Sequence, residues 1–486
     1  MGFGMTRLRF AAGPRTVYGK LFPHRAKNKA LQYGNRQLEL LQEKRKKLQT
    51  IDDKLNFLEQ ETLTVSFKIG YGMTFYLMPL FGYMFRAGKI LKRHLAHAED
   101  NEIASYLGLL CQGKSDFDHI EPFRQDPFFS QSLMITTVPS SSTLRQRLDM
   151  GAKTGWAKTI MEQSVALLGS LQAKITPCLG DLVPLDIDVS PFDNSGTKKE
   201  GVSCTYKKVD GYAPVLAYLG EEGYGVNVEL REGKEHSQNN TPSFLKQSID
   251  NARRITQAKL LVRMDSGFDS LDNIKICIEE ECDYLIKRNL RQESKEDWLF
   301  VAQKQGLCTE ERPGKKVYRG EIFLERGLKQ PLRLIFKVTE RTIDADGQVL
   351  LIPDIEVDTY WTSLNNSPNE VIKQYQNHGT SEQFHSEIKS ELDLERLPSG
   401  KFKTNNLVLH LGLAAYNILR FIGQESLKAA DSPLRKKVQR RRIRTVIQNL
   451  ITLASKLVHH ARRCKLSFGC HSPWFLTFRR IYYSLA

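Results

Sequence analysis

The middle of the chain alternates short apolar runs with amphipathic stretches. Between residues 182 and 289, runs bounded by turn residues predict strands, and stretches with apolar residues three or four apart predict helices. The predicted strands are 182–190, 212–220, 224–232, 259–267 and 282–289, and the predicted helices are 241–255 and 270–281. Three strands joined by short turns, then strands separated by helices, predict a mixed sheet in an α/β domain. This is the element order of a ribonuclease H-like fold.

The pattern changes between residues 298 and 357, where helical periodicity is weak. Four apolar stretches there predict strands at 298–305, 315–325, 330–338 and 349–361. We therefore expect an all-β insertion within the α/β domain.

Five regions follow from these patterns. They are a basic, mainly helical N-terminal DNA-binding region (1–175), the first part of the ribonuclease H-like core (176–297), the β-rich insertion (298–357), the Glu-bearing helical part of the core (358–430) and a basic helical C-terminal region (431–486). In the first region, residues 36–61 predict a helix with leucines seven apart, which is typical of either a packed face or a short self-association seam. Residues 138–149 predict a Ser/Thr-capped helix bearing arginines.

Charge is distributed unevenly along the 486 residues. The net charge is +16, residues 1–50 carry twelve Lys/Arg and two Glu (+10), and residues 433–486 carry thirteen Lys/Arg and no acid (+13). The middle therefore carries 16 − 23 = −7. Two basic ends around an acidic centre favour a polyanionic partner, with nucleic acid preferred over an anionic membrane surface. The uncharged run 69–85 is short and interrupted by Gly and Pro, so we expect no membrane span.

Carboxylates stand at the ends of two predicted strands. Asp186 and Asp188 share one face of the first strand, and Asp265 follows the apolar run of the fourth. A third candidate, Glu382, lies on a predicted helix. Three hard oxygen ligands that converge at one sheet edge suit Mg²⁺ ions, with Mn²⁺ as a substitute, in phosphoryl transfer.

The Glu-bearing stretch is "YQNHGTSEQFHSEIK", residues 375–389. Gly379 is expected to end one helix, and Thr380 with Gln383 predicts a capping box that starts the next. Glu382 and Lys389, seven residues apart, are then expected on one face of the second helix.

Three blocks in order, "DIDVS", "VRMDSGF" and "YQNHGTSEQFHSEIK", resemble the catalytic blocks of DDE insertion-sequence transposases. The third resembles the Tyr-Arg-Glu-Lys signature, in which Arg follows Tyr after two residues, Glu after three more and Lys after six more. Tyr375, Glu382 and Lys389 fit that spacing, and His378 stands where the Arg belongs. "ELREGKEHS" and "LHLGLAAYNILRF" add a similarity to the 1380 family of insertion sequences, over roughly residues 115 to 480.

The resemblance implies a metal-dependent enzyme that cuts transposon ends and joins them to target DNA. It implies Asp188, Asp265 and Glu382 as metal ligands, with Asp186 an open alternative to Asp188, and Glu387 a weaker one to Glu382. Tyr375, His378 and Lys389 are the implied DNA phosphate contacts. Trp298 is a candidate for base stacking, although anchoring the insertion's own core is the favoured role.

The resemblance also implies double-stranded DNA as partner, as terminal inverted repeats and target, and a homodimer in the DNA complex. Scattered cysteines without a CxxC pair favour a reducing compartment, so we expect a bacterial cytoplasmic protein, nucleoid-associated when bound to DNA. His378 in place of Arg leaves one alternative open, a catalytically inactive transposase-derived DNA-binding protein. In the active case, an Arg at position 378 is expected to preserve or raise strand cleavage.

Overall fold

The computed structural model describes residues 39, 100–126, 129–130, 133, 135–344, 346–453, 455–460, 463–468 and 472–485. The predicted helix 36–61 and the apolar run 69–85 therefore lie outside the described residues, apart from residue 39. The chain divides into two compact units, Leu148–Asn417 and the remainder, Met1–Arg147 with Ile418–Ala486. The first unit holds all the candidate site residues.

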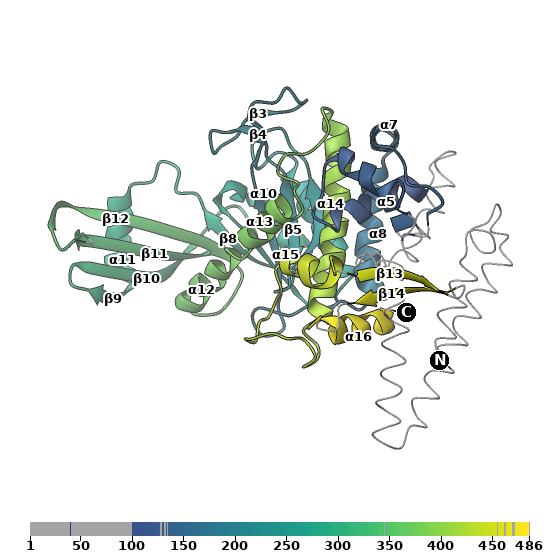
Figure 1. Ribbon diagram of the computed structural model, residues 1–486. Helices are drawn as coiled ribbons and strands as arrows, with labels where there is room; N and C mark the ends of the chain where they lie inside the picture. The colour runs from purple at the N-terminus through teal and green to yellow at the C-terminus, as the bar shows by residue number, and fades with distance from the viewer. Residues whose placement is uncertain are drawn as a thin grey trace, which may run out of the picture. The chain divides into compact units, whose positions relative to one another are not determined.

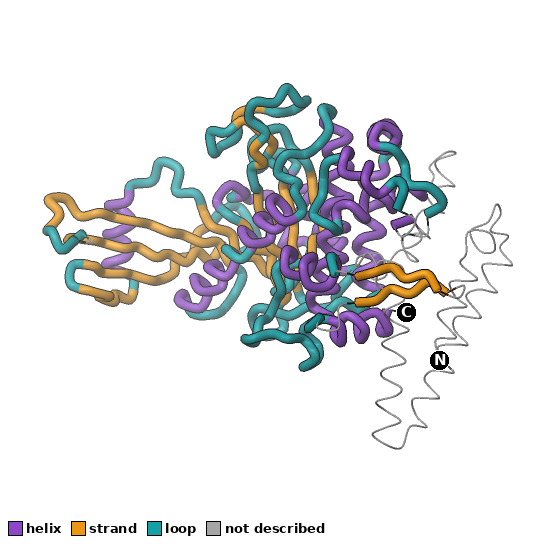
Figure 2. The backbone as a smooth tube through the Cα atoms, viewed as in Figure 1, coloured by secondary structure: helices purple, strands orange, loops and turns teal. Residues whose placement is uncertain are grey.

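A nine-stranded mixed sheet organises the unit 148–417, with strand order β6-β5-β1-β7-β8-β12-β11-β10-β9 (Figures 1 and 2). Its first five strands are β1 (Val183–Val189), β5 (Val215–Leu219), β6 (Tyr224–Glu229), β7 (Leu260–Met264) and β8 (Asp283–Arg288). Strand β1 runs antiparallel to β5 and parallel to β7, and β7 runs parallel to β8. The mixed α/β prediction is confirmed, and this arrangement is consistent with a ribonuclease H-like fold.

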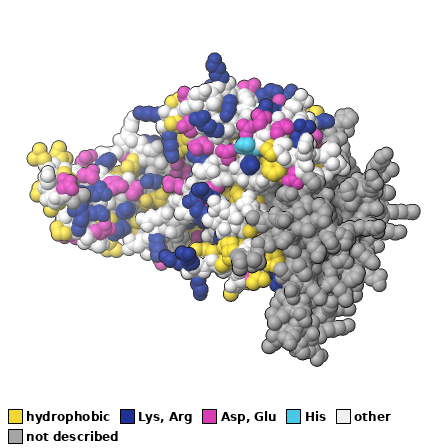
Figure 3. Space-filling view, viewed as in Figure 1, with side chains coloured by type: hydrophobic (Ala, Val, Ile, Leu, Met, Phe, Trp, Pro, Cys, Tyr) yellow, Lys and Arg dark blue, Asp and Glu magenta, His cyan; other side chains and the backbone are white. Residues whose placement is uncertain are grey.

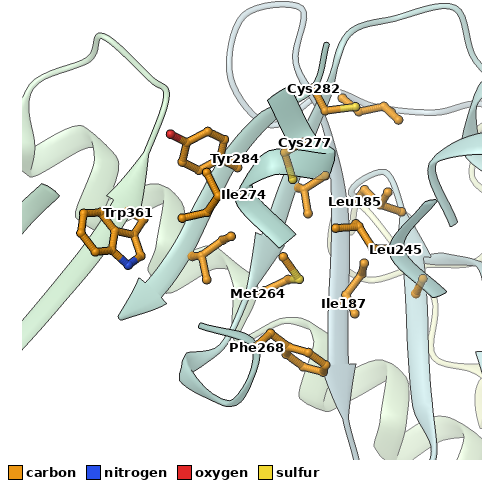
Figure 4. Close-up of a cluster of buried hydrophobic side chains, with 14 of the residues drawn as sticks. Leu185, Ile187, Leu245, Met264, Phe268, Ile274, Cys277, Cys282, Tyr284 and Trp361 are labelled. Atoms are coloured by element: carbon orange, nitrogen blue, oxygen red, sulfur yellow. The ribbon is translucent and has the colours of Figure 1, made fainter. Parts of the chain in front are cut away.

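The two faces of the central strands have different neighbours, because side chains alternate along a strand. Leu185 and Ile187 of β1 join a core with side chains from helices α9 (Thr241–Arg253) and α10 (Leu271–Glu279), as Figure 4 shows. On the opposite face, Leu261 and Leu285 pack with residues of helix α12 (Pro368–His378). Asp186 and Asp188 alternate with Leu185 and Ile187, so they face the α12 side.

The predicted all-β insertion differs from the structure in two ways. Residues 298–305 were expected as a strand but belong to helix α11 (Lys295–Gln305). Ser294 caps this helix by accepting a hydrogen bond from the backbone N–H of Asp297 (3.1 Å), and the buried Trp298 and Ala302 are four residues apart, a helical spacing. The aromatic and β-branched content of this stretch favoured a strand, but the cap and the helical spacing prevail.

The strands of this region do not form a separate sheet. They are β9 (Leu307–Arg312), β10 (Lys315–Leu324), β11 (Leu332–Ile343) and β12 (Val349–Thr362). The end of β12 pairs with β8, from Thr359 opposite Arg288 to Thr362 opposite Leu285, so the region extends the central sheet. The far end of β12 is exposed, and Leu351 there is 99% exposed; Figure 3 shows apolar side chains gathered at this end.

The remaining helices, turns and strands complete the unit 148–417. They are α8 (Trp156–Ser170), β2 (Phe192–Asp193), β3 (Ser203–Cys204), β4 (Asp210–Tyr212), the 3₁₀ turn η2 (Ser266–Phe268), α13 (Ser381–Ser386), the π-helical turn η3 (Glu387–Glu391) and most of α14 (Phe402–Glu425). Strands β2, β4 and β3 form a small sheet of their own, in that order. Helix α14 is long and apolar enough to cross a membrane, but 94% of its most apolar window is buried, which is typical of a core helix.

The other unit, as far as it is described, holds the outer elements of the chain. They are α5 (Asp100–Leu110), η1 (Phe117–Phe123), most of α7 (Ser141–Lys153), α15 (Ile443–Val446), the π-helical turn η4 (Ile447–Ile451), β13 (Ser455–His460), β14 (Arg463–Phe468) and α16 (Phe475–Leu485). Strands β13 and β14 form an antiparallel hairpin, which the prediction of a helical C-terminal region did not include. Helix α7 agrees with the helix expected after the Ser/Thr run.

A buried asparagine attaches α14 to the edge strand β6. The Asn417 side chain accepts a hydrogen bond from the Gly225 N–H (2.8 Å) and donates one to the Gly225 carbonyl (2.7 Å) and one to the Ser164 hydroxyl (3.0 Å). A side chain at position 225 would collide with Leu413 of the same helix, so glycine permits this close approach. The amide thus satisfies backbone groups that have no water available.

Asn417→Leu is therefore expected to lower the free energy of unfolding by at least about 2 kcal/mol, because it leaves two buried backbone groups of Gly225 without hydrogen-bond partners. Urea denaturation of the two proteins measures the difference. Lys403→Leu, at an exposed position of α14, is the control and should stay within about 0.5 kcal/mol of the wild type. Equal losses in both variants would contradict the assigned role of Asn417.

Candidate active site

Two of the predicted acidic residues lie at neighbouring strand ends. Strands β1 and β7 are parallel and adjacent, and their last registered pair is Ile187 with Met264. Asp188 and Asp265 each come one residue later, so the register brings them to the same edge of the sheet. Asp265 caps the turn η2 by accepting a hydrogen bond from the Gly267 N–H (3.0 Å).

The protonation of these two carboxylates differs. Burial, followed by the negative charge of Asp188, raises the pKa of Asp265 to about 6. Burial also disfavours the charged form of Asp188, but His385, His378 and the hydrogen bond from the Val189 N–H together outweigh burial and bring the pKa of Asp188 down to about 2. The site therefore holds one stable carboxylate and a second whose charge is opposed by the first.

Asp188 is held by side chains of helix α13. Its Oδ2 accepts hydrogen bonds from the Ser381 hydroxyl (3.1 Å) and from His385 Nε2 (3.2 Å), and its Oδ1 accepts one from the Val189 N–H (2.7 Å). Since Nε2 donates to a carboxylate, Nδ1 of a neutral His385 accepts the hydrogen bond from the Tyr218 hydroxyl (3.1 Å). This chain of contacts fixes the direction in which Asp188 points.

Asp186 has a different environment. It is 2% exposed, and both of its oxygens accept from the Arg263 guanidinium, at 2.6 Å from Nε and 2.7 Å from the terminal nitrogen. His378 Nδ1 lies 2.8 Å from Oδ1. Burial opposes the charge, yet Arg263 and His378 hold the pKa of Asp186 below its ordinary value. This enclosed carboxylate suits a structural ion pair, and the geometry therefore favours Asp188 over Asp186 as the reactive carboxylate.

His378 is the last residue of α12 and is 5% exposed. Burial disfavours its charged form, but Asp186 and then Asp188 raise its pKa above the ordinary value. A phosphate contact by this imidazole does not fit its burial in this structure. An Arg at position 378, expected above to be tolerated, would place a second guanidinium beside the buried Arg263.

The break in the Glu-bearing stretch falls where the sequence predicted it. Helix α12 ends at His378, Gly379 follows, and α13 begins at Ser381. The predicted capping box at Thr380 is absent, because the Thr380 side chain makes no capping hydrogen bond; Ser367 and Glu370 form one at the start of α12 instead.

Glu382 and Lys389 are not on one continuous α-helix. Glu382 is exposed on the first turn of α13, whereas Lys389 lies in the π-helical turn η3, which shifts the phase between them. The Lys389 ammonium donates to the Pro191 carbonyl (2.5 Å) and lies 5.4 Å from the centre of the Phe192 ring. Burial lowers the pKa of Lys389. Glu387, the weaker alternative ligand, is 1% exposed within this turn.

The two aromatic candidates are both packed. Tyr375 lies one turn before the end of α12, with its ring 4.8 Å from that of Tyr360 and 5.7 Å from the imidazole of His378. Trp298 is 8% exposed, donates its Nε1–H to Glu293 (2.9 Å) and packs against Phe336. Trp298 is thus part of the core, and base stacking by it does not fit this position.

The residues present fit a divalent cation in part. Asp188 and Asp265 offer hard oxygen ligands, and a bound cation would relieve the repulsion by Asp188 that, after burial, raises the pKa of Asp265. Glu382 shares this side of the molecule, since Asp188, Asp265 and Glu382 all raise the pKa of the Tyr206 phenol after burial. Among residues 100–486 as far as described, however, no three His, Cys, Asp or Glu side chains lie close enough to hold one ion together.

Several residues of this site were not among those predicted from the sequence. Arg263 offered a signal, because a charged residue inside an apolar strand requires a partner, and Asp186 is its registered neighbour on β1. His385 also offered a signal, because it lies three residues after Glu382 and therefore one helical turn further along the same predicted helix. Ser381, Tyr218 and Tyr206 gave no signal, since each depends on a contact between distant segments.

Comparison with known proteins identifies the family. Residues 91–486 match the family described as "Transposase DDE domain group 1", so the chain belongs to this family of DDE transposases. Such transposases in general cleave DNA and transfer strands, and they generally use divalent metal ions.

Two further comparisons add little. A solved structure described as the piggyBac transposase synaptic complex with hairpin DNA is 13% identical over 75% of each chain. With a TM-score of 0.37, this likeness is too slight to carry an argument. No curated protein matches the chain.

The two aspartates of β1 are expected to respond differently to neutralisation. Asp186→Asn should lower the free energy of unfolding by about 3–5 kcal/mol, because it leaves Arg263 buried without its counter-charge. Asp188→Asn should cost less, roughly 1–2 kcal/mol, since it weakens the hydrogen bonds that favour the ionised carboxylate but leaves the Asp186–Arg263 pair intact. Urea unfolding of both variants checks this, and a larger loss in Asp188→Asn would reverse the roles assigned to the pair.

Proposed function

We propose that the protein is a Mg²⁺-dependent transposase that cuts at the ends of an insertion sequence and joins those ends to target DNA. The observation that carries the proposal is the Asp188–Asp265 pair at the ends of two adjacent parallel strands, in a chain of the DDE family. The Tyr-Arg-Glu-Lys signature and the likeness to the 1380 family favour a bacterial insertion sequence as the mobile element. The proposed location is the cytoplasm, on the nucleoid when bound to DNA.

Asp188, Asp265 and Glu382 are the proposed ligands of two Mg²⁺ ions, which Mn²⁺ could replace. When bound, such ions activate the attacking oxygen and stabilise the leaving oxygen of phosphoryl transfer. Glu382 is exposed on the first turn of α13, the helix whose Ser381 and His385 already contact Asp188.

The chain's own residues prepare Asp188 for this role. Ser381 and His385 orient the carboxylate and keep it ionised, and Tyr218 holds the imidazole from behind. Next to the site, Arg263 of β7 and His378 of α12 both bind Asp186, and these contacts hold β7 and α12 against β1. His378 is thus proposed as a positioning residue instead of a phosphate contact.

Tyr375 and Lys389 remain the proposed contacts to DNA phosphates. Lys389 is near enough to Glu395 and Asp188 for their charges to interact, and its ammonium donates a hydrogen bond to the Pro191 carbonyl beside the Phe192 ring. Incoming phosphate could replace the carbonyl as its partner. Double-stranded terminal repeats and target DNA are the proposed substrates, bound by a homodimer.

The inactive alternative rested on His378 in place of Arg. His378 is a buried partner of Asp186, so its departure from the signature has a structural role and does not by itself favour that alternative.

Cleavage of labelled duplexes made from the DNA that flanks the gene tests the proposal. With Mg²⁺, the wild type is expected to nick the duplexes, and Asp188→Ala, Asp265→Ala and Glu382→Ala are expected to lose at least about 10²-fold in rate. Asp272→Ala, which removes an exposed carboxylate of α10, is the matched control and should cleave like the wild type. Identical products from the wild type and all three site variants would falsify the proposal.

A change of metal preference sharpens the same test. Asp188→Cys and Asp265→Cys should be inactive with Mg²⁺ and regain cleavage with Mn²⁺, because thiolate binds the softer ion better. Failure of Mn²⁺ to restore either variant, with both shown to be folded, would argue against direct metal ligation by these positions.

A further inference from the structure

A closed turn projects an aromatic side chain beside the candidate active site. The turn joins β3 to β4, and it is fastened by hydrogen bonds from the Thr205 N–H to the Val209 carbonyl (2.9 Å) and from the Lys208 N–H to the Thr205 carbonyl (2.9 Å). The Thr205 hydroxyl donates to the same Val209 carbonyl (2.9 Å). Tyr206 stands at the tip of this turn and is therefore held in a defined place.

A hydrogen bond from the Tyr206 hydroxyl shows where this side chain lies relative to the carboxylates. The hydroxyl donates to the carbonyl of Val189 (3.4 Å), the residue that follows Asp188 on β1. The side chain is nevertheless 63% exposed, so its ring does not serve the core. The ring is thus a wall of the site with a face open to solvent.

Two lysines lie next to the Tyr206 ring in the sequence. The Lys207 ammonium lies 5.9 Å from the ring centre, and Lys207 and Lys208 are both exposed. Lys207 also contributes to the lowered pKa of Lys389, after burial, so the two ammonium groups lie near each other, and Lys389 in turn lies near Asp188. An aromatic face flanked by cations suits a nucleotide, because the ring stacks on a base while the cations contact backbone phosphates.

We propose that Tyr206 stacks on the base next to the phosphate that is cleaved, with Lys207 contacting the adjoining backbone. Tyr206 then positions the DNA strand across Asp188 and Asp265, and it favours an end whose terminal base is unstacked from the duplex. The inference rests on the proposed function, since it assigns a further substrate contact to that site.

Cleavage and base fluorescence together test the inference. Tyr206→Leu is expected to reduce kcat/KM for the flanking-DNA duplexes by on the order of tenfold, the typical effect of one lost base–aromatic stack. Tyr206→Phe keeps the ring and should stay within about twofold of the wild type. A 2-aminopurine placed next to the cleavage site should be quenched on binding, in Ca²⁺, by the wild type and Tyr206→Phe but not by Tyr206→Leu.

A matched control comes from the same chain. Phe300 of α11 is 58% exposed and carries the Lys304 ammonium 4.0 Å from its ring centre, but it has no contact with the site carboxylates among those described. Phe300→Leu should leave both cleavage and fluorescence unchanged.

The possible results separate this inference from the proposed function. If Tyr206→Leu matches the wild type in rate and quenching while Asp188→Ala is inactive, the stacking role is wrong and the proposed function stands. If Tyr206→Phe is as impaired as Tyr206→Leu, the hydroxyl acts instead of the ring, and stacking is again excluded. If Asp188→Ala cleaves like the wild type, the proposed function itself fails.

Discussion

Asp186 and Arg263 form a buried ion pair across the two central strands of the sheet, and the geometry of the site depends on it. They are registered neighbours on β1 and β7, joined by two short hydrogen bonds and almost fully excluded from water. Separating such a pair is costly, since the charge left behind has no solvent. Sliding β7 against β1 by one residue would separate it, so the pair opposes any register other than the one that aligns Asp188 with Asp265.

The same alternation places the chemistry on one face of the sheet. Apolar residues of β1 face α9 and α10, while Asp186 and Asp188 face α12 and α13, whose residues supply their partners. The break between those helices at Gly379 lets His378 reach Asp186 from the end of α12, and lets Ser381 and His385 reach Asp188 from α13. The break between α12 and α13 thus lets the two helices contact two different carboxylates, Asp186 and Asp188.

Much of this architecture could be predicted from local patterns. The five core strands, helices α9 and α10 and the end of α12 follow from periodicity and turn residues, which act over a few residues. Helix α11 was missed because its cap outweighed a β-rich composition, and the extension of the sheet was missed because β12 pairs with β8 across about 70 residues of chain. His378 was misplaced for the same reason, since its partner Asp186 lies 192 residues earlier in the chain.

Asp188 and Asp265 are proposed to oppose each other's charge and to bind a divalent cation together. Titration of the DNA-free protein with Mn²⁺, followed by electron paramagnetic resonance, tests this pairing. We predict that the wild type and Asp272→Asn bind Mn²⁺ alike, and that Asp188→Asn and Asp265→Asn each lose most of that binding. Equal Mn²⁺ binding by all four proteins would contradict the account.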